Sequence, residues 1–181
     1  MILAFDMDGP IVDLHGYWLN LYNNDYNDNL TVGQVKEWDM TRLVKPECGV
    51  KIYDYFTMHG FFRHAPPVAG AVEAVRELNS LHRVYLVTSC PPGPGLEEKC
   101  QWVAEHLPFL RQGQIVIMED KFRFEADVLV DDAPHNLKPW RRVPVIWDMP
   151  YNRGLAGLRA TGATGREKWW CVQRILKGVG C

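Results

Sequence analysis

The sequence predicts an α/β fold in which helices cover both faces of a parallel sheet, with a small helical segment inserted after the first strand. Short apolar runs rich in β-forming residues alternate with longer stretches of helical periodicity, which is typical of parallel sheets. A stretch rich in aromatic residues separates the first apolar run from the second. The chain's 181 residues suit one domain of ordinary size with a small insertion.

The first predicted strand covers residues 2–5 and stops at Asp6, which is followed by Asp8 and Gly9. Two carboxylates this close repel each other unless a cation lies between them. Glycine permits a sharp turn and a close approach of the backbone to a ligand. This ending indicates a metal site at the carboxyl edge of the sheet, where open α/β sheets bind their ligands.

Residues 14–66 are predicted to form a small, all-helical insert. The apolar positions of its first helix share one face, at Leu14, Trp18, Leu21 and Tyr22. Thr31 and Gln34 have capping-box spacing, so a second short helix is expected to begin there and to end near residues 38–40. Pro46 is suited to open a third helix. The residues expected to face inward from it are Val50, Tyr53, Phe56 and Thr57.

The remaining chain is predicted to complete the α/β core. Strands are expected at residues 83–87, 115–117, 127–130 and 143–147. The inward residues of the helices between them are predicted to be Val68, Val72, Val75, Leu78 and Leu81, then Leu96, Cys100, Val103 and Leu107. The strand at 115–117 is expected to be buried, and Pro144 suggests that the last strand lies at an edge. A capping box at Thr164 and Glu167 begins the final helix. That helix is expected to bury Trp169, Val172, Ile175 and Leu176.

Composition argues against several classes of function. The net charge is −2 without a basic patch, which disfavours binding of a nucleic acid polymer. No apolar run is long enough to span a bilayer, and Asp6 follows the apolar start too soon for a signal peptide. An odd number of cysteines without a C-x-x-C pair indicates reduced thiols in a cytoplasmic protein. These cysteines are Cys48, Cys90, Cys100, Cys171 and Cys181. The six histidines show no ligand spacing and are expected at the surface or at hinges.

Polar side chains follow three of the predicted strands where each strand ends. They are Asp6 and Asp8, then Thr88 and Ser89, then Asp131 and Asp132. Because the strands are predicted to be parallel, these ends lie at one edge of the sheet and the side chains should converge. Lys121 follows the strand at 115–117 and can reach the same place. Lys99 and Lys138 are alternative sources of this ammonium group.

This set of side chains suits phosphoryl transfer. The carboxylates suit a hard divalent cation, in the first place magnesium, while hydroxyl and ammonium groups suit phosphate oxygens. Asp6 ends the strand and is held most firmly, so it is assigned nucleophilic attack on phosphorus. Asp8 lies in the loop and is assigned as the acid and base. The phosphate anchors are expected to be Thr88, Ser89 and Lys121, with capping of the next loop as the alternative for Ser89.

The ordered motifs D-x-D-G, strand-Thr-Ser, Lys and strand-Asp-Asp resemble the haloacid dehalogenase (HAD) phosphohydrolases. Response-regulator receiver domains use similar parts, but their acidic pair comes first, so the order here disfavours them. A closer resemblance is to the 5′(3′)-deoxyribonucleotidases. It rests on residues 6–13, 61–62, 69–75, 88–91, 98–99, 102–103, 120–121 and 131–134.

The resemblance implies a Rossmann-like HAD core at residues 1–13 and 67–181 with a helical cap at 14–66. It also implies magnesium as the cofactor and release of phosphate from deoxyribonucleoside monophosphates. Metal ligation would fall to Asp6, the Asp8 backbone carbonyl and Asp132, with Asp131 as a supporting neighbour. Trp38 falls where the family places an aromatic over the base, and ordinary packing is the alternative. The same pocket would take Leu14, Phe61 and Phe62, although only one of these phenylalanines can face it in an extended chain.

The hypothesis is therefore a magnesium-dependent phosphohydrolase that removes phosphate from nucleoside monophosphates through an aspartyl-phosphate. The alternatives are a HAD phosphatase of another small metabolite and a catalytically idle, HAD-like binding domain. Pro10, Leu14 and Ala133 depart from the family pattern, which leaves the base and sugar preference open. The expected partner is a small nucleotide, with no nucleic acid polymer and no membrane, and a homodimer is left open.

Overall fold

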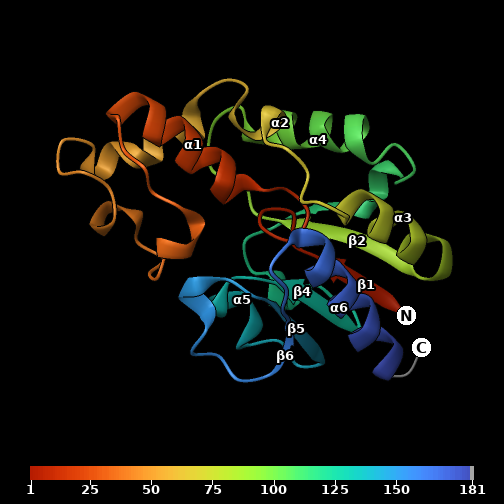
Figure 1. The fold of residues 1–181 in the computed structure, drawn as a ribbon. Helices are drawn as coiled ribbons and strands as arrows, with labels where there is room; N and C mark the ends of the chain where they lie inside the picture. Colours follow the sequence, from red (N-terminus) through yellow and green to blue (C-terminus); the bar gives the residue numbers. More distant parts are fainter. Residues whose placement is uncertain (180–181) are drawn as a thin grey trace.

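The computed structural model describes residues 1–179 and contains one six-stranded sheet. Its strands are β1 (Ile2–Phe5), β2 (Arg83–Thr88), β3 (Ile115–Ile117), β4 (Val128–Asp131), β5 (Val143–Trp147) and β6 (Leu158–Ala160). They lie in the order β3-β2-β1-β4-β5-β6, and every neighbouring pair is parallel (Figure 1). The predicted parallel sheet is therefore confirmed, with the first strand of the chain near its centre.

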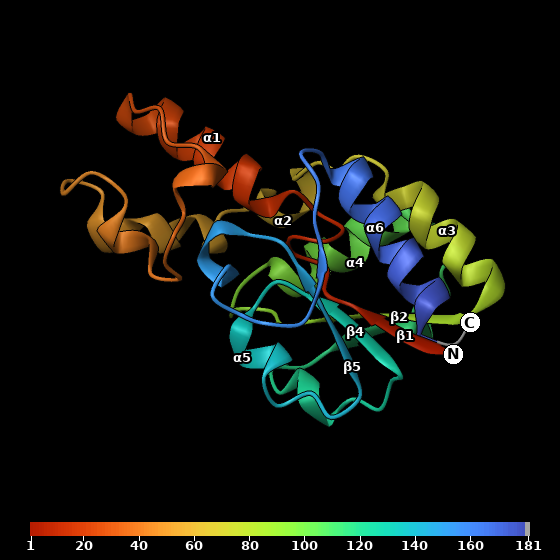
Figure 2. The same ribbon diagram turned by 60° about the horizontal axis from the view of Figure 1, so that its bottom comes forward.

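Helices cover both faces of this sheet because alternate strand residues point to opposite sides. Leu3 and Phe5 of β1 pack into a large apolar cluster with residues of three helices. These helices are α3 (Ala71–Leu81), α4 (Gly95–His106) and α6 (Gly165–Gly178). Ala4 packs on the other side, in a smaller cluster with Leu137 of α5 (Pro134–Leu137). Figure 2 shows α3 and α6 over one face of the sheet and α5 on the opposite side.

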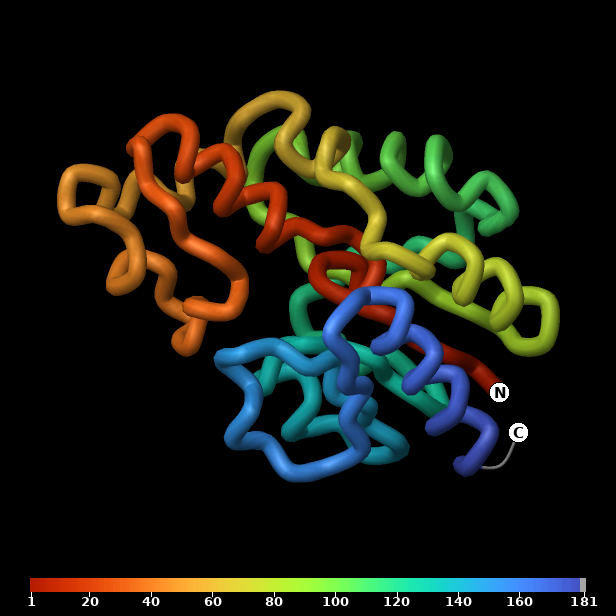
Figure 3. The backbone as a smooth tube through the Cα atoms, viewed as in Figure 1, coloured from red at the N-terminus to blue at the C-terminus, as the bar shows by residue number. Residues whose placement is uncertain are grey.

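Between β1 and α3 the chain forms the helical insert. Its elements are α1 (Leu14–Tyr26), α2 (Phe61–His64) and the 3₁₀ helices η1 (Val32–Gln34), η2 (Met40–Arg42) and η3 (Gly49–Thr57). Figure 3 shows the chain leaving the sheet after β1 and returning to it ahead of α3. Aromatic packing joins these elements: the Trp18 and Phe56 ring centroids lie 4.7 Å apart, and the Trp18 indole donates to the Ile52 carbonyl oxygen. The division of the chain at residues 14 and 66 stays a prediction.

Two details predicted for the insert are wrong. The short helix capped by Thr31 ends at Gln34 rather than near residues 38–40, because Asp39 caps a separate turn at η2. In the next helix the buried residues are Ile52 and Tyr55, whereas Val50 and Tyr53 are exposed. That helix is a 3₁₀ helix, in which inward positions recur every three residues. Val50, Tyr53 and Phe56 have this same spacing, but the observed inward set, Ile52 and Tyr55, lies on a different face.

The predicted inward face of the helix at α4 is confirmed at Val103 and Leu107 and wrong at Leu96 and Cys100. Leu96 and Cys100 are exposed, while Lys99 and Trp102 are completely buried. The Trp102 indole donates to the carbonyl oxygen of Ala65 at 2.7 Å, which ties this face to the end of the insert. A similar error affects Leu81, the last residue of α3, which is exposed. In α6 the core takes Trp169, Val172 and Leu176, with Ile175 only half-buried.

The edges of the sheet also differ from prediction. β3 is an edge strand with Ile117 exposed, and β5 is an internal strand because β6, which was not predicted, pairs beyond it. Pro144 is tolerated there because of register. Val143 donates its amide to Asp127 on the β4 side, so residue 144 faces β6, whose pairing begins only at Val145.

Other predictions hold for the residues described. Capping boxes are present at Thr31 and at Thr164, which begins α6. The cysteines Cys48, Cys90, Cys100 and Cys171 are free thiols, and Cys181 lies outside the described residues. Over residues 1–179, no helix has both the length and the apolar character needed to cross a membrane.

Candidate active site

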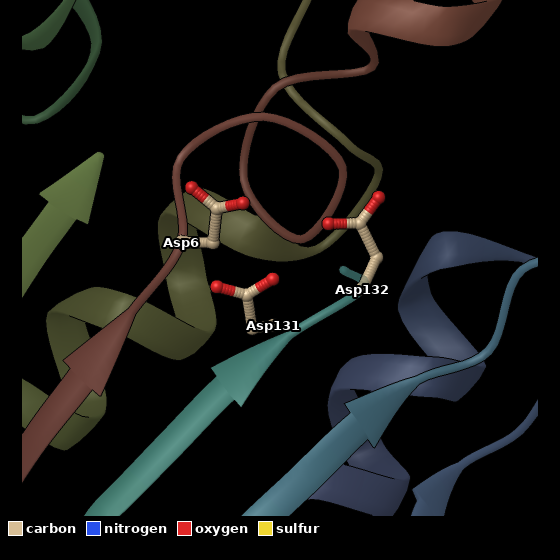
Figure 4. Close-up of side chains that lie close together, drawn as sticks. All are labelled: Asp6, Asp131 and Asp132. Atoms are coloured by element: carbon tan, nitrogen blue, oxygen red, sulfur yellow. The ribbon is translucent and has the colours of Figure 1, made fainter. Parts of the chain in front are cut away.

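The polar side chains predicted to converge do meet at the carboxyl ends of the strands. Asp6 follows β1, Asp131 ends β4 and Asp132 comes next. Each offers a carboxylate oxygen, and these oxygens all lie within 4.8 Å of one another. Figure 4 shows the three carboxylates pointing toward a common space.

The loop after β1 holds Asp6 and Asp8 in place through its backbone. The Asp6 amide still donates to Val130 on β4, so sheet pairing extends to this residue. The loop then closes with the Ile11 and Val12 amides donating to the Met7 carbonyl oxygen at 3.2 and 2.8 Å. Gly9 has a φ of +111°, and a Cβ there would lie 3.1 Å from the Asp132 carboxylate. Glycine is therefore required both by the turn and by the close approach of Asp132.

Lys121 supplies a positive charge to the group of carboxylates. It lies in η5 (Lys121–Arg123), is buried, and has its ammonium 2.6 Å from Asp6 and 3.1 Å from Asp131. Asp131 has both oxygens engaged, because it also accepts hydrogen bonds from the Ala133 amide and the Asn136 side chain. These contacts orient Asp131 toward Lys121.

Lys99 supplies a second ammonium group, on the other aspartate. It extends from α4, is 0% exposed, and donates to Asp8 at 2.5 Å, to the Thr88 hydroxyl at 2.9 Å and to the Ser89 carbonyl at 2.7 Å. The sequence offered Lys99 only as an alternative to Lys121. The structure places both lysines in the site, and Lys138 is exposed.

The site holds more negative charge than its lysines offset. Burial raises the pKa of Asp6 from 3.8 to about 7; Lys121 opposes this rise, and Asp131 and Asp8 add to it. Burial, Asp6 and Asp131 raise the pKa of Asp132 well above its usual value. Although burial opposes it, the same two neighbours, Asp6 and Asp131, raise the pKa of the Lys121 ammonium. A further cation would relieve this excess.

The donor set fits a hard divalent cation. Asp6 uses one oxygen for the Met7 amide and Lys121, and Asp132 uses one for the Tyr151 hydroxyl. Within residues 1–179, no hydrogen bond engages the second oxygen of either carboxylate. Two carboxylate oxygens that face a common space without a protein partner are the ligands that magnesium prefers.

A cavity of about 550 Å³ opens above this group between the sheet and the insert. The predicted site residues among its lining are Asp6, Asp8, Leu14, Trp38, Phe62, Ser89, Lys121 and Asp132. Thr88 and Asp131 are 0% exposed and lie behind the lining. Phe61 also lies behind the lining, and its ring packs 5.5 Å from that of Phe56. The pair occupies a helix rather than an extended chain, and only Phe62 reaches the cavity.

Sequence reasoning did not assign His15, His135 and Tyr151 to the site, although all three line the cavity. His135 is exposed, as predicted for the histidines, whereas His15 is half-buried. The Nδ1 atom of His15 is buried and has no hydrogen-bond partner among residues 1–179. Burial lowers the pKa of His15, which favours the neutral imidazole. The signal that could have identified Tyr151 is its place shortly after β5, which ends at Trp147. Polar residues that follow parallel strands lie at the same edge of the sheet.

Comparison with known proteins gives consistent matches. The family model described as 5′ nucleotidase, deoxy (pyrimidine), cytosolic type C protein (NT5C) matches residues 1–170. A 5′(3′)-deoxyribonucleotidase of Clostridium acetobutylicum is 34% identical over 151 residues, which is 83% of each chain. A haloacid dehalogenase-like family hydrolase from Xanthomonas campestris has a similar fold, with a TM-score of 0.55, 14% identity and coverage of 99% and 97% of the two chains. A magnesium-bound structure from Bacillus subtilis, described as a HAD-hydrolase, has a TM-score of 0.52 at 17% identity and covers 80% and 87%.

Proposed function

Because this chain belongs to the NT5C family of 5′ nucleotidases, and so is a phosphoric monoester hydrolase of the 5′(3′)-deoxyribonucleotidase type, we propose that it hydrolyses deoxyribonucleoside monophosphates with magnesium through an aspartyl-phosphate. The observation that carries this proposal is the group of Asp6, Asp131, Asp132 and Lys121 at the floor of a cavity large enough for a nucleotide. Asp6 and Asp132 would hold the magnesium ion, together with the Asp8 backbone carbonyl. When bound, the ion would offset charge on the transferring phosphoryl group.

In the first step, a carboxylate oxygen of Asp6 forms a bond to phosphorus while the bond from phosphorus to the sugar oxygen breaks. Asp8 gives its proton to the departing sugar oxygen. In the second step, Asp8 takes a proton from water as the water oxygen attacks phosphorus. The Asp6–phosphorus bond then breaks, and inorganic phosphate is released. The contacts of Lys99 with Asp8 and Thr88 support the placing of Asp8, because they hold its side chain beside the end of β2.

The upper part of the cavity supports a nucleoside as the leaving group. Leu14, Trp38 and Phe62 give it an apolar wall on the side of the insert. Aromatic rings can stack on a base, and an apolar wall beside the sugar would leave an added 2′-hydroxyl without a partner. We therefore propose these three residues as the substrate contacts and Ser89, Thr88 and Lys121 as phosphate anchors.

We further propose that the enzyme acts in the cytoplasm on free nucleotides, rather than on a nucleic acid polymer or at a membrane. The net charge of −2 supports this, since polyanions bind basic surfaces. We also propose that the insert, residues 14–66, acts as a cap on the core formed by residues 1–13 and 67–181. Size-exclusion chromatography with light scattering would decide between a monomer and a homodimer.

A panel of phosphate esters tests the proposed function. Phosphate release should be fastest with deoxyribonucleoside 5′- or 3′-monophosphates, slower with ribonucleotides, and lost in EDTA. Preference for sugar phosphates would replace this proposal with a phosphatase of another small metabolite. An absence of release from every ester, with magnesium present, would favour an idle binding domain.

Magnesium should also stabilise the fold more at pH 8 than at pH 5. The folded pKa of Asp6, about 7, lies above the unfolded value of 3.8, so between these values the folded state holds a proton that the unfolded chain has lost. Stability without metal therefore falls as the pH rises from about 4 to 7. At a hundred times its dissociation constant, magnesium adds about 2.7 kcal/mol, and Tm should rise by roughly 5–10 °C at pH 8. Thermal melts in EDTA and in magnesium at both pH values measure this, and an equal shift at both would contradict it.

A further inference from the structure

The segment after β5 fastens Asp132 at two points. It forms the short helix η6 (Pro150–Asn152), and the Tyr151 hydroxyl donates a hydrogen bond to Oδ2 of the Asp132 carboxylate. The next side chain, Asn152, donates to the backbone carbonyl of Asp132 at 2.8 Å and to that of Trp147 at 2.8 Å. Asn152 is buried and is itself held by Arg159. One short helix therefore fixes both the backbone and the side chain of Asp132.

We propose that Tyr151 is a positioning residue that orients the Asp132 carboxylate for the divalent cation. This inference rests on the proposed function, in which Asp132 holds magnesium. The hydroxyl engages Oδ2, which leaves Oδ1 without a hydrogen-bond partner among the described residues. A carboxylate held in this way cannot rotate freely, so the geometry of its free oxygen is set before the cation arrives. Such outer partners of metal ligands commonly change affinity 10- to 100-fold when removed.

Tyr151 is suited to act as a donor rather than as a ligand. A tyrosine phenol ordinarily keeps its proton at neutral pH, and this hydroxyl lies against Oδ2 of Asp132. The hydroxyl therefore donates one hydrogen bond to a carboxylate, which is the geometry of an orienting contact.

The ring of Tyr151 has a second, separable contact. The Trp38 ring of the insert stands edge-on to it at 5.3 Å and 88°, and the His15 ring lies 5.6 Å away. Trp38 also meets His135 of the core at 5.3 Å and 87°. The hydroxyl thus contacts the cation ligand, whereas the ring contacts the insert. Removing the hydroxyl alone should weaken cation binding and leave the contact with the insert in place.

The test is Tyr151→Phe, which keeps the ring and removes the hydroxyl. Calorimetric titration of EDTA-stripped protein with MgCl2 should show affinity reduced 10- to 100-fold. The magnesium concentration that gives half-maximal phosphate release should rise by a similar factor, with KM for the nucleotide at saturating magnesium nearly unchanged. Tyr55→Phe is the matched control, because its hydroxyl also donates to an aspartate, Asp25, and neither of these residues lines the cavity. That control should bind magnesium as wild type does.

Two results would contradict the proposed role of Tyr151, and a second variant covers a failure to fold. Unchanged magnesium affinity in a folded Tyr151→Phe protein would overturn this inference and leave the proposed function standing. Wild-type protein that binds no magnesium would overturn both. If the phenylalanine variant fails to fold, Tyr151→Met offers a second protein without the hydroxyl. This variant should show the same loss of magnesium affinity as predicted for Tyr151→Phe. Its KM for the nucleotide should also rise, since the ring that contacts Trp38 is lost.

Discussion

Replacing Asp6 with asparagine is expected to lower phosphate release by about 10⁴-fold or more, because the variant lacks the oxygen nucleophile that forms the bond to phosphorus. The amide has nearly the same shape as the carboxylate, so the cavity should persist. Steady-state release of phosphate from dUMP and dTMP, with saturating magnesium, measures the effect. Loss in kcat rather than a rise in KM alone is expected, since the bond forms only in the transition state.

The same substitution should leave the fold intact or make it more stable. Burial raises the pKa of Asp6 to about 7, so above that pH the folded protein retains a charge that its surroundings disfavour. A neutral amide removes this cost, as often happens when an active-site group is replaced. Thermal melts at pH 8 in EDTA should therefore show a Tm equal to or above that of wild type.

Asp13→Asn is the matched control, because this carboxylate caps the start of α1 and does not line the cavity. Asparagine also caps helices well, so both activity and Tm should stay close to wild type. An Asp6→Asn protein that keeps more than a hundredth of wild-type activity would contradict the assignment of Asp6 as the nucleophile.

The convergence of the acidic residues could be predicted because it depends only on strand direction. Once the strands are parallel, Asp6 and Asp131 must lie at the same edge, whatever the details of packing. The capping boxes at Thr31 and Thr164 were equally accessible, since a capping box is local in the sequence. These parts of the fold follow from patterns that neighbouring residues carry.

What sequence reasoning missed depends on contacts between distant segments. β6 is as short as β3, but its sequence Leu-Arg-Ala is not a run of β-forming apolar residues, and its pairing partner is identified only in three dimensions. Tyr151 reaches Asp132 across 19 positions through a turn with no recognisable motif. In η3 two sets of apolar residues recur every three positions, and only packing against the rest of the insert decides that Ile52 and Tyr55 point inward.

Lys99 is the most instructive difference from prediction, because the sequence offered it only as an alternative to Lys121 and indicated Leu96 and Cys100 for the inner face of α4. Lysine is almost never fully buried without a partner. In the structure, Lys99 and Trp102 occupy the inner face instead, and the ammonium reaches Asp8, Thr88 and Ser89. A buried charge was therefore the residue that determined how the helix is turned.

Lys99→Met should impair both activity and stability. Methionine fills similar space without a charge, leaving Asp8 without its ammonium partner and the Ser89 carbonyl without its donor. Removing one partner of a buried ion pair costs about 3 kcal/mol, which corresponds to a fall in Tm of roughly 6–12 °C. Because a positive charge near the phosphoryl group is lost as well, kcat should fall about 10²- to 10³-fold.

The measurement should separate lost catalysis from lost stability and from lost metal. Assays at 20 °C keep the variant folded, and calorimetry should show nearly normal magnesium affinity, since Lys99 contacts Asp8 and not the carboxylates of Asp6 or Asp132. Tyr151→Phe is expected to show the reverse, with magnesium affinity reduced. Lys138→Met, at an exposed lysine that the sequence had left as an alternative, should retain full kcat and Tm. If Lys99→Met kept kcat within a factor of three of wild type, the lysine would serve the fold alone, and Lys121 would be sufficient for the phosphoryl charge.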